Sequence, residues 1–294
     1  MSKLASRLGV FLVGIPVVLL LVLLNICNHL PFHFLAISMV LLGSMELYDM
    51  MNRKTKLLSK PFVVSCAVFL PVVSAVYSTL TVFTDIKAVV GPEIVTYAYI
   101  VTVLVILFAE VFTAQSFDDS ILKIASSIFI ITYCGFLFTF VSKLTLITDY
   151  KTKDASILIS IFALMVFFCD SFAWFFGVLF GKKSRGIVKA SPNKSLVGFF
   201  GGFIGSIAAG LIGYFCWPII FNGSIVKTMI LGICMAAASI IGDLAESVFK
   251  RSTGVKDSGT LMPGRGGILD SIDSILMAAP VYYFLISILY GYGQ

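Results

Sequence analysis

Long apolar stretches alternate with short polar ones along the whole chain. An α-helix needs about 20 predominantly apolar residues to cross the hydrocarbon core of a bilayer. The pattern predicts about nine such spans, with boundaries good to a few residues. The predicted spans cover residues 8–27, 32–49, 61–84, 94–114, 121–146, 155–180, 196–220, 225–248 and 268–290.

The predicted fold class is therefore all-α, a polytopic integral membrane protein with no separate soluble domain. Of its 294 residues, 59% are hydrophobic and 12% are charged, whereas soluble domains carry about 25% charged residues. We divide the chain into N-terminal spans, residues 1–120, and a C-terminal region, residues 121–294, which holds two polar motifs at 170–202 and 242–274. The net charge of +6 suits an anionic membrane surface, and no nucleic-acid partner is expected.

The Lys and Arg residues indicate how the spans are oriented. The loops after the second, fourth, sixth and eighth spans hold 14 of the 21 Lys and Arg residues. By the positive-inside rule these loops are cytoplasmic, and both polar motifs then face the cytoplasm. Lys3 and Arg7 would lie outside, a conflict that a re-entrant segment near the start would remove.

The most charged stretch runs from Gly242 to Ser274, between the last two spans. Within a helix, Asp243, Glu246 and Lys250 would share one face, at i, i+3 and i+7. Asp270 and Asp273 would share a face of the next helix. Carboxylate oxygens are the ligands that Mg²⁺ prefers, and a Gly-rich loop lets backbone N–H groups approach phosphate. An ordinary basic loop would explain the cations but not the carboxylates at the helix ends.

Other carboxylates fall within or at the ends of spans. Asp170 would lie on the order of 15 Å deep along the sixth span. Such residues are functional by default, although a helix–helix hydrogen bond through Asp170 and Ser171 is the alternative. Glu46 and Asp49 close the second span and are interpreted as an ordinary solvated helix end.

Both polar motifs resemble those of the phosphatidate cytidylyltransferase (CDP-diacylglycerol synthase) family. The first match comprises Ser247, Lys250, Arg251, Lys256, Asp257, Pro263, Gly264, Arg265, Gly266, Gly267, Asp270, Ser271 and Asp273. The second comprises Asp170, Ser171, Ala173, Trp174, Ser191, Pro192, Lys194, Ser195 and Gly198. Arg265, Ser271 and Val197 depart from the pattern, which usually has His, Arg and Glu there. The resemblance covers roughly residues 170–274 of the chain.

The resemblance implies a reaction in phospholipid biosynthesis. Phosphatidate attacks the α-phosphorus of CTP, which gives CDP-diacylglycerol and diphosphate. A phosphate monoester carries a charge of about −1.5 to −2, so the nucleophile needs no strong base. Catalysis then consists of positioning and charge neutralisation.

The resemblance also implies residue roles in an active-site cleft at the cytoplasmic side of the C-terminal helices. Asp170, Asp243, Asp270 and Asp273 would bind Mg²⁺, with a second cation left open. The expected catalytic residues are Lys250, Lys256, Asp257 and Arg265. The expected substrate-binding residues are Ser191, Lys194, Ser195, Ser247, Arg251, Gly266 and Gly267. The expected partners are CTP, phosphatidate and the bilayer of the cytoplasmic membrane, and a homodimer is left open.

Two other functions compete with this one. A CTP-dependent kinase for a polyprenol-type alcohol would need a base, for which Asp257 is available. A secondary transporter would show interrupted spans at corresponding positions of two halves. We see no such symmetry, because the charged residues gather in the last third of the chain.

Overall fold

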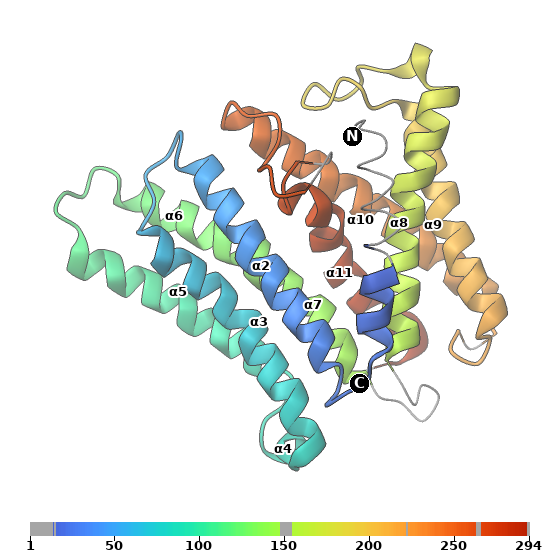
Figure 1. Ribbon diagram of the computed structural model, residues 1–294, viewed down its shortest axis with the longest axis horizontal. Coiled ribbons are helices and arrows are strands. Elements are labelled where there is room, and N and C mark those ends of the chain that lie inside the picture. Colours follow the sequence, from blue (N-terminus) through green and yellow to red (C-terminus); the bar gives the residue numbers. More distant parts are fainter. Residues whose placement is uncertain (1–13, 15, 148–154, 222, 263–265, 293–294) are drawn as a thin grey trace. The chain divides into compact units, whose positions relative to one another are not determined.

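The computed structural model describes residues 14, 16–147, 155–221, 223–262 and 266–292 (Figure 1). Over these residues the chain forms helices, loops and two isolated bridges between single residue pairs, Arg185 with Ser195 and Met262 with Gly266, without an extended strand. The predicted all-α class is confirmed. Arg265, one of the expected catalytic residues, lies outside the described residues.

Eight helical segments of the described chain are long and apolar enough to cross a membrane. They are α2 (Leu30–Met51), α3 (Lys60–Phe83), α5 (Ile94–Thr113), a continuous stretch from Ser120 to Leu146, α8 (Ser156–Leu179), α9 (Leu196–Cys216), α10 (Ile225–Ser252) and α11 (Leu269–Tyr290). Each matches a predicted span to within a few residues. The remaining predicted span, 8–27, is described at residues 14 and 16–27, of which 14 and 16–23 are helical.

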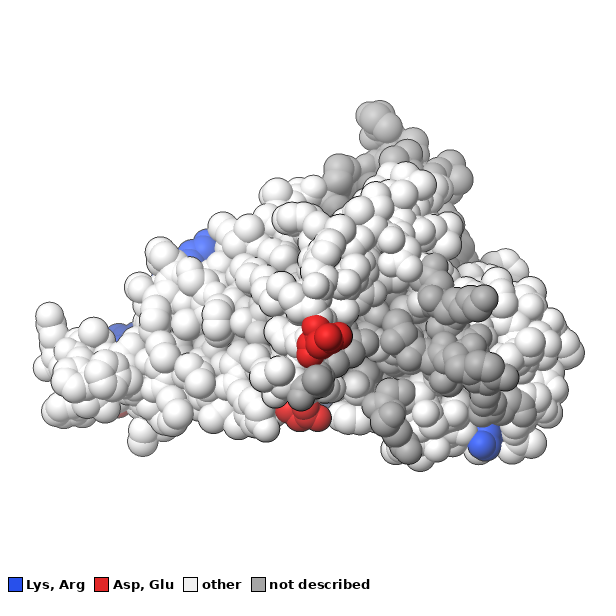
Figure 2. Space-filling model, turned by 90° about the horizontal axis from the view of Figure 1, so that it is seen from below, with Lys and Arg blue, Asp and Glu red and all other residues white. Residues whose placement is uncertain are grey.

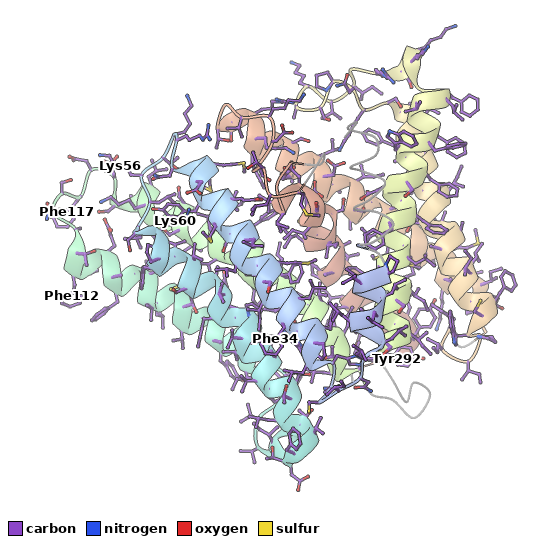
Figure 3. The ribbon with its side chains drawn as sticks, in the orientation of Figure 1. Phe34, Lys56, Lys60, Phe112, Phe117 and Tyr292 are labelled. Carbon is purple, nitrogen blue, oxygen red and sulfur yellow. The ribbon has the colours of Figure 1, made fainter. Side chains whose placement is uncertain are left out.

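Many large apolar side chains point outward, as lipid-facing side chains do. Phe34 on α2 is 63% exposed, and Phe112 at the end of α5 is 71% exposed (Figure 3). The face seen in Figure 2 shows few Lys, Arg, Asp or Glu side chains among its described residues. Exposed apolar area of this extent is unfavourable in water and favourable in lipid. The protein is a multi-pass membrane protein.

The chain divides into two compact units, and the loop after α10 belongs to the first of them. Unit 1 comprises Met1–Lys143 and Thr253–Ile272, and unit 2 comprises Leu144–Ser252 and Asp273–Gln294. The division expected from the sequence, at residue 120, stays a prediction. The loop after α10 joins unit 1 because it is bonded to α2, as described below.

Unit 1 is built on α2, α3, α5 and the stretch from Ser120 to Lys143. This stretch begins as α6 (Ser120–Ile130), continues as a π-helical turn η1 (Ile131–Phe136) and ends as α7 (Leu137–Lys143). Helix α3 packs against α2, α5 and η1. Gly135 of η1 allows the closest approach, since a Cβ there would lie 2.7 Å from the carbonyl oxygen of Ala67. The short helix α4 (Ile86–Val89) follows α3.

Unit 2 is built on α8, α9 and α10, with most of α11. Small residues on α9 let it approach α8 closely, as in other membrane helix pairs. A Cβ added at Gly201 would lie 2.7 Å from the carbonyl oxygen of Phe172. Helix α11 is tied to α8 because the hydroxyl of Tyr282 donates to the carbonyl oxygen of Leu158 at 2.9 Å. This packing sets the positions of the polar residues on α8, α10 and α11.

Candidate active site

Helix α10 carries one charged face at its C-terminal end. It continues to Ser252, so Asp243, Glu246 and Lys250 are all helical and share the face that their spacing predicts. Glu246 is completely buried, and its carboxylate forms an ion pair with the ammonium group of Lys250. Ser247 lies beside them and is 8% exposed. Sequence reasoning placed Glu246 on this face but gave it no role in the site.

Four carboxylates of unit 2 lie near one another. Asp273 of α11 is close enough to Asp243, Glu246 and Asp170 for their charges to interact. The Asp170 carboxylate of α8 accepts from the hydroxyl of Ser239 at 3.5 Å and from the hydroxyl of Ser274 at 3.5 Å. Asp273 is 6% exposed and accepts from the backbone N–H of Ser274. We call Asp170, Asp243, Glu246 and Asp273 the acidic cluster.

Two lysines compensate part of this negative charge. Lys194, from the loop before α9, forms an ion pair with Asp243, as Lys250 does with Glu246. The four carboxylates and two ammonium groups leave a formal excess of two negative charges. Charges inside a bundle of membrane-spanning helices are costly unless they are paired or coordinate a cation. The cluster therefore has the electrostatics of a cation-binding site.

The loop between α8 and α9 carries Lys194, Ser191 and the 3-10 turn η3 (Lys182–Ser184). It is closed on itself by a bond from the backbone N–H of Gly186 to the carbonyl oxygen of Pro192 at 3.0 Å. The guanidinium Nε of Arg251 on α10 donates to the carbonyl oxygen of Ala190 at 3.1 Å and so holds the loop beside the end of α10. Ser191 is half-buried in this loop.

Ser195 has a local structural task that the sequence did not indicate. It is the N-cap of α9, and its side-chain oxygen accepts from the backbone N–H of Gly198 at 3.1 Å. The residue is 3% exposed. The hydroxyl oxygen satisfies one of the unpaired N–H groups of the first helical turn. Substrate binding by Ser195, expected from the sequence motif, stays a prediction.

The loop after α10, described at residues 253–262 and 266–268 in unit 1, is folded around two carboxylates. Oδ2 of Asp270 accepts from the backbone N–H of Gly267 at 2.7 Å, and from the backbone N–H and hydroxyl of Ser258 at 2.9 Å and 2.7 Å. The second carboxylate is Glu46 of α2, which is 7% exposed and accepts from Ser258, Ile268 and Leu269. The interpretation of Glu46 as a solvated helix end is wrong, because this loop covers it.

Asp49, the neighbour of Glu46 in that interpretation, does lie at the surface. Its carboxylate binds the ammonium group of Lys60 at 2.7 Å. Lys56 likewise binds Asp119, at 2.5 Å. These are exposed ion pairs, which contribute little to the stability of the fold. The two acidic residues at the end of α2 therefore differ completely in environment.

The remaining expected site residues of the loop are spread over its surface and its turn. Lys256 and Asp257 are exposed. Gly266 has a positive φ of 111° and donates its N–H to the carbonyl oxygen of Met262 at 3.1 Å. The N–H groups of Gly266 and Gly267 are both bonded, to Met262 and to Asp270, so a phosphate would have to compete for them. Ser271, which departs from the family pattern, donates to the carbonyl oxygen of Gly267 at 3.4 Å.

The donor set of the acidic cluster fits Mg²⁺, although its side chains do not form a complete coordination shell. Among the described residues, no three His, Cys, Asp or Glu side chains are arranged to hold a metal ion. Protein-bound Mg²⁺ commonly takes only one or two carboxylates and completes its octahedron with water and substrate phosphate. Hard carboxylate oxygens with an excess of negative charge meet that requirement.

Comparison with known proteins settles the family. A sequence model of the cytidylyltransferase family matches residues 5–289. The chain belongs to this family. The match includes α2 and the other N-terminal helices as well as the two polar motifs, so family membership extends well beyond residues 170–274.

Several members of the family are similar to this chain. It is 34% identical over 182 residues to phosphatidate cytidylyltransferase 5, chloroplastic, of Arabidopsis thaliana, a match that covers 55% of the chain and 44% of that relative. It is 40% identical over 129 residues to the phosphatidate cytidylyltransferase of Haemophilus influenzae, covering 43% of the chain and 44% of the relative. The match to the Thermotoga maritima enzyme is 40% over 129 residues, covering 42% and 46%. The chain thus spans about half the length of the curated relatives it matches.

Proposed function

We propose that this protein is a phosphatidate cytidylyltransferase, which converts CTP and phosphatidate into CDP-diacylglycerol and diphosphate. Membership of the cytidylyltransferase family supports the reaction class. The observation that carries the proposal is the acidic cluster, in which Asp243 and Glu246 already hold Lys194 and Lys250. Such a site can bind a cation and phosphate groups together, as nucleotidyl transfer requires.

In this reaction a phosphate oxygen of phosphatidate forms a bond to the α-phosphorus of CTP. The bond from that phosphorus to the bridging oxygen breaks, and its electron pair leaves with diphosphate. Lys194 and Lys250 would exchange part of their pairing with Asp243 and Glu246 for pairing with phosphate oxygens. The Lys194 and Lys250 side chains are only partly exposed, at 22% and 13%, which strengthens the interaction of their ammonium groups with an anion.

Within unit 2, Asp243 and Asp273 would hold Mg²⁺, with Asp170 beside them. Asp270 is the fourth proposed ligand, and its assignment as a Mg²⁺ ligand comes from the sequence motif. Mg²⁺ bound there would neutralise charge on the phosphates and hold them in line. The formal excess of negative charge leaves room for a second cation.

Arg251, Ser191 and Ser247 are proposed to bind substrate beside these groups, and Lys256, Asp257 and Arg265 to act from the loop after α10. The protein would lie in the cytoplasmic membrane with this site facing the cytoplasm, as the Lys and Arg distribution indicates. Phosphatidate would enter from the bilayer, because its acyl chains stay there. A homodimer, the remaining expectation, is tested by light scattering of the purified protein in detergent.

The proposal is tested by incubating the purified protein with radiolabelled CTP, Mg²⁺ and phosphatidate and then extracting the lipids. Label from the α-phosphate in a CDP-lipid, with diphosphate in the aqueous phase, supports the cytidylyltransferase. A lipid phosphate with CDP, formed from a polyprenol in place of phosphatidate, would instead identify a lipid kinase. No transfer to any lipid would exclude both enzymes.

A further inference from the structure

Glu46 lies near the end of α2, far from both polar motifs in the sequence, yet it is bonded to the second of them. Its carboxylate accepts from the hydroxyl of Ser258 at 3.1 Å, from the backbone N–H of Ile268 at 3.0 Å and from the backbone N–H of Leu269 at 2.9 Å. All four residues belong to unit 1. A buried carboxylate in a membrane helix is costly, and three charge-assisted hydrogen bonds offset that cost.

The position of these donors explains why a charged acceptor is used. Ile268 and Leu269 stand at the N-terminus of α11, where backbone N–H groups have no partner within the helix. The helix dipole also places partial positive charge there, which favours an anion. Glu46 therefore caps a helix that begins more than 200 positions later in the chain.

Two glycines of the loop leave room for the Glu46 carboxylate. A Cβ added at Gly259 would lie 2.7 Å from Cδ of Glu46, and a Cβ added at Gly267 would also lie 2.7 Å from it. Neither distance is compatible with a side chain unless the carboxylate moves. Since both glycines belong to the loop, the loop encloses Glu46 closely from two sides.

Ser258 connects this capping carboxylate to Asp270. Its single hydroxyl proton is within reach of Oε2 of Glu46 at 3.1 Å and of Oδ2 of Asp270 at 2.7 Å. Its backbone N–H also donates to Asp270. A shift of Glu46 would therefore change both the start of α11 and the orientation of the Asp270 side chain.

We propose that Glu46 is a positioning residue for the reaction: it fixes Ser258, Ile268 and the carboxylate of Asp270, and it touches neither substrate nor metal. This inference rests on the proposed function and extends the catalytic machinery to an N-terminal helix. Misplacing a catalytic group by about 1 Å can cost about 100-fold in rate. Activity should therefore depend on Glu46 more strongly than folding does.

The test compares Glu46→Gln with two control variants. Gln keeps the volume, but its NH₂ group would face the backbone N–H of either Ile268 or Leu269, so at least one bond is lost. Asp49→Asn changes an exposed carboxylate one turn further along α2, and Glu110→Gln changes another buried carboxylate of unit 1, 4% exposed and paired with Lys123. Each protein is compared in three experiments: thermal unfolding in detergent, hydrogen exchange of peptides covering 255–272, and steady-state kinetics that give kcat and KM for CTP.

We expect the Glu46→Gln protein to remain folded. Its Ile268 and Leu269 amide hydrogens should exchange at least about 10-fold faster than in the wild type. Its kcat should be about 10- to 100-fold lower, with a smaller change in KM. In Asp49→Asn and Glu110→Gln, the amide hydrogens of this loop should exchange at the wild-type rate, and kcat should equal that of the wild type. Unchanged exchange in Glu46→Gln would show that the carboxylate does not hold the loop. Faster exchange with an unchanged kcat would restrict Glu46 to a structural role, and either result overturns the proposal.

Ser258→Ala provides a second variant should Glu46→Gln fail to fold. It removes only the shared hydroxyl and should give an intermediate loss of kcat. A wild-type kcat in Ser258→Ala would overturn the link to Asp270. If the wild-type protein makes no CDP-lipid, the proposed function fails, whereas the exchange rates of Ile268 and Leu269 still decide whether Glu46 anchors the loop.

Discussion

The carboxylate of Glu46 accepts a hydrogen bond from the backbone N–H of Leu269 at 2.9 Å, between residues 223 positions apart. This contact places part of an N-terminal helix in the same compact unit as the loop that carries the most charged motif. The N-terminal helices therefore do more than anchor the protein in the bilayer. They supply an acceptor for the start of α11, which is the helix that carries Asp270 and Asp273.

Gly259→Ala tests the space around Glu46. The added Cβ would overlap the carboxylate, and overpacking of this kind costs about 1–3 kcal/mol. We expect a lower unfolding temperature and a lower kcat. Glu46→Asp withdraws the carboxylate by one methylene, so the double variant should be less impaired than Gly259→Ala alone. For each variant, thermal unfolding gives the unfolding temperature and CDP-lipid synthesis gives kcat.

Thr260→Ala is the matched control for that substitution, because Thr260 is exposed next to Gly259. It should leave unfolding temperature and kcat near wild type. Additive effects of Gly259→Ala and Glu46→Asp would contradict the arrangement, since residues in contact are expected to couple.

Asp273→Asn tests the acidic cluster. The change keeps the volume of a side chain that is 6% exposed and removes its charge. Because the charge is proposed to hold Mg²⁺ and so to neutralise phosphate, we expect turnover at limiting Mg²⁺ to fall about 100-fold or more. Asp243→Asn should behave similarly, and it also removes the partner of Lys194. Initial rates over a Mg²⁺ series measure the effect.

The Asp273 result is compared with Glu110→Gln, a buried carboxylate outside the cluster, which should keep its Mg²⁺ dependence. Thermal unfolding establishes that each variant is folded. An Asp273→Asn protein that retained most of its activity at limiting Mg²⁺ would remove Asp273 from the proposed ligands.

The spans could be predicted because membrane insertion is encoded locally. A run of about 20 apolar residues is sufficient, and α8 begins one residue from its predicted start. The face shared by Asp243, Glu246 and Lys250 was also local, since it follows from helical spacing. Glu46 could not be placed in this way, because its partners lie on a distant segment. The available signal was a carboxylate inside an otherwise apolar helix, which alone suggests a functional residue.

For Ser195, the sequence supports two different interpretations. Its place in a family motif suggested substrate binding, but a Ser immediately before an apolar run is also an N-cap signal. A motif residue can have a structural task, and only the bond to Gly198 reveals it.

Ser195→Ala separates the structural task from substrate binding. Loss of the cap should lower the free energy of unfolding by about 0.5–2 kcal/mol. The KM for CTP should stay near wild type, because the hydroxyl points to the backbone of α9. Ser191→Ala is the comparison, because Ser191 is proposed to bind phosphate. This substitution should raise KM without a comparable loss of stability. A raised KM in Ser195→Ala at unchanged stability would instead support the substrate-binding role that the motif suggests for Ser195.

The orientation of the protein can be tested with an exposed residue of the loop after α10. Thr260 is exposed, whereas the neighbouring Ser258 is 8% exposed and engaged with Glu46 and Asp270. Thr260→Cys should therefore react with a membrane-impermeant maleimide only when the cytoplasmic side is accessible. The physical reason is the excess of Lys and Arg in this loop, which is retained on the cytoplasmic side during insertion.

The chain supplies its own reference for the opposite side. Cys216 is exposed at the end of α9, which the same charge distribution places outside. In the wild-type protein Cys216 should be labelled in intact cells, and Cys216→Ser should abolish that labelling. In the Cys216→Ser background, Thr260→Cys should be labelled only in inverted vesicles. Labelling of Thr260→Cys in intact cells would reverse the orientation and place the loop, with its proposed catalytic residues, away from cytoplasmic CTP.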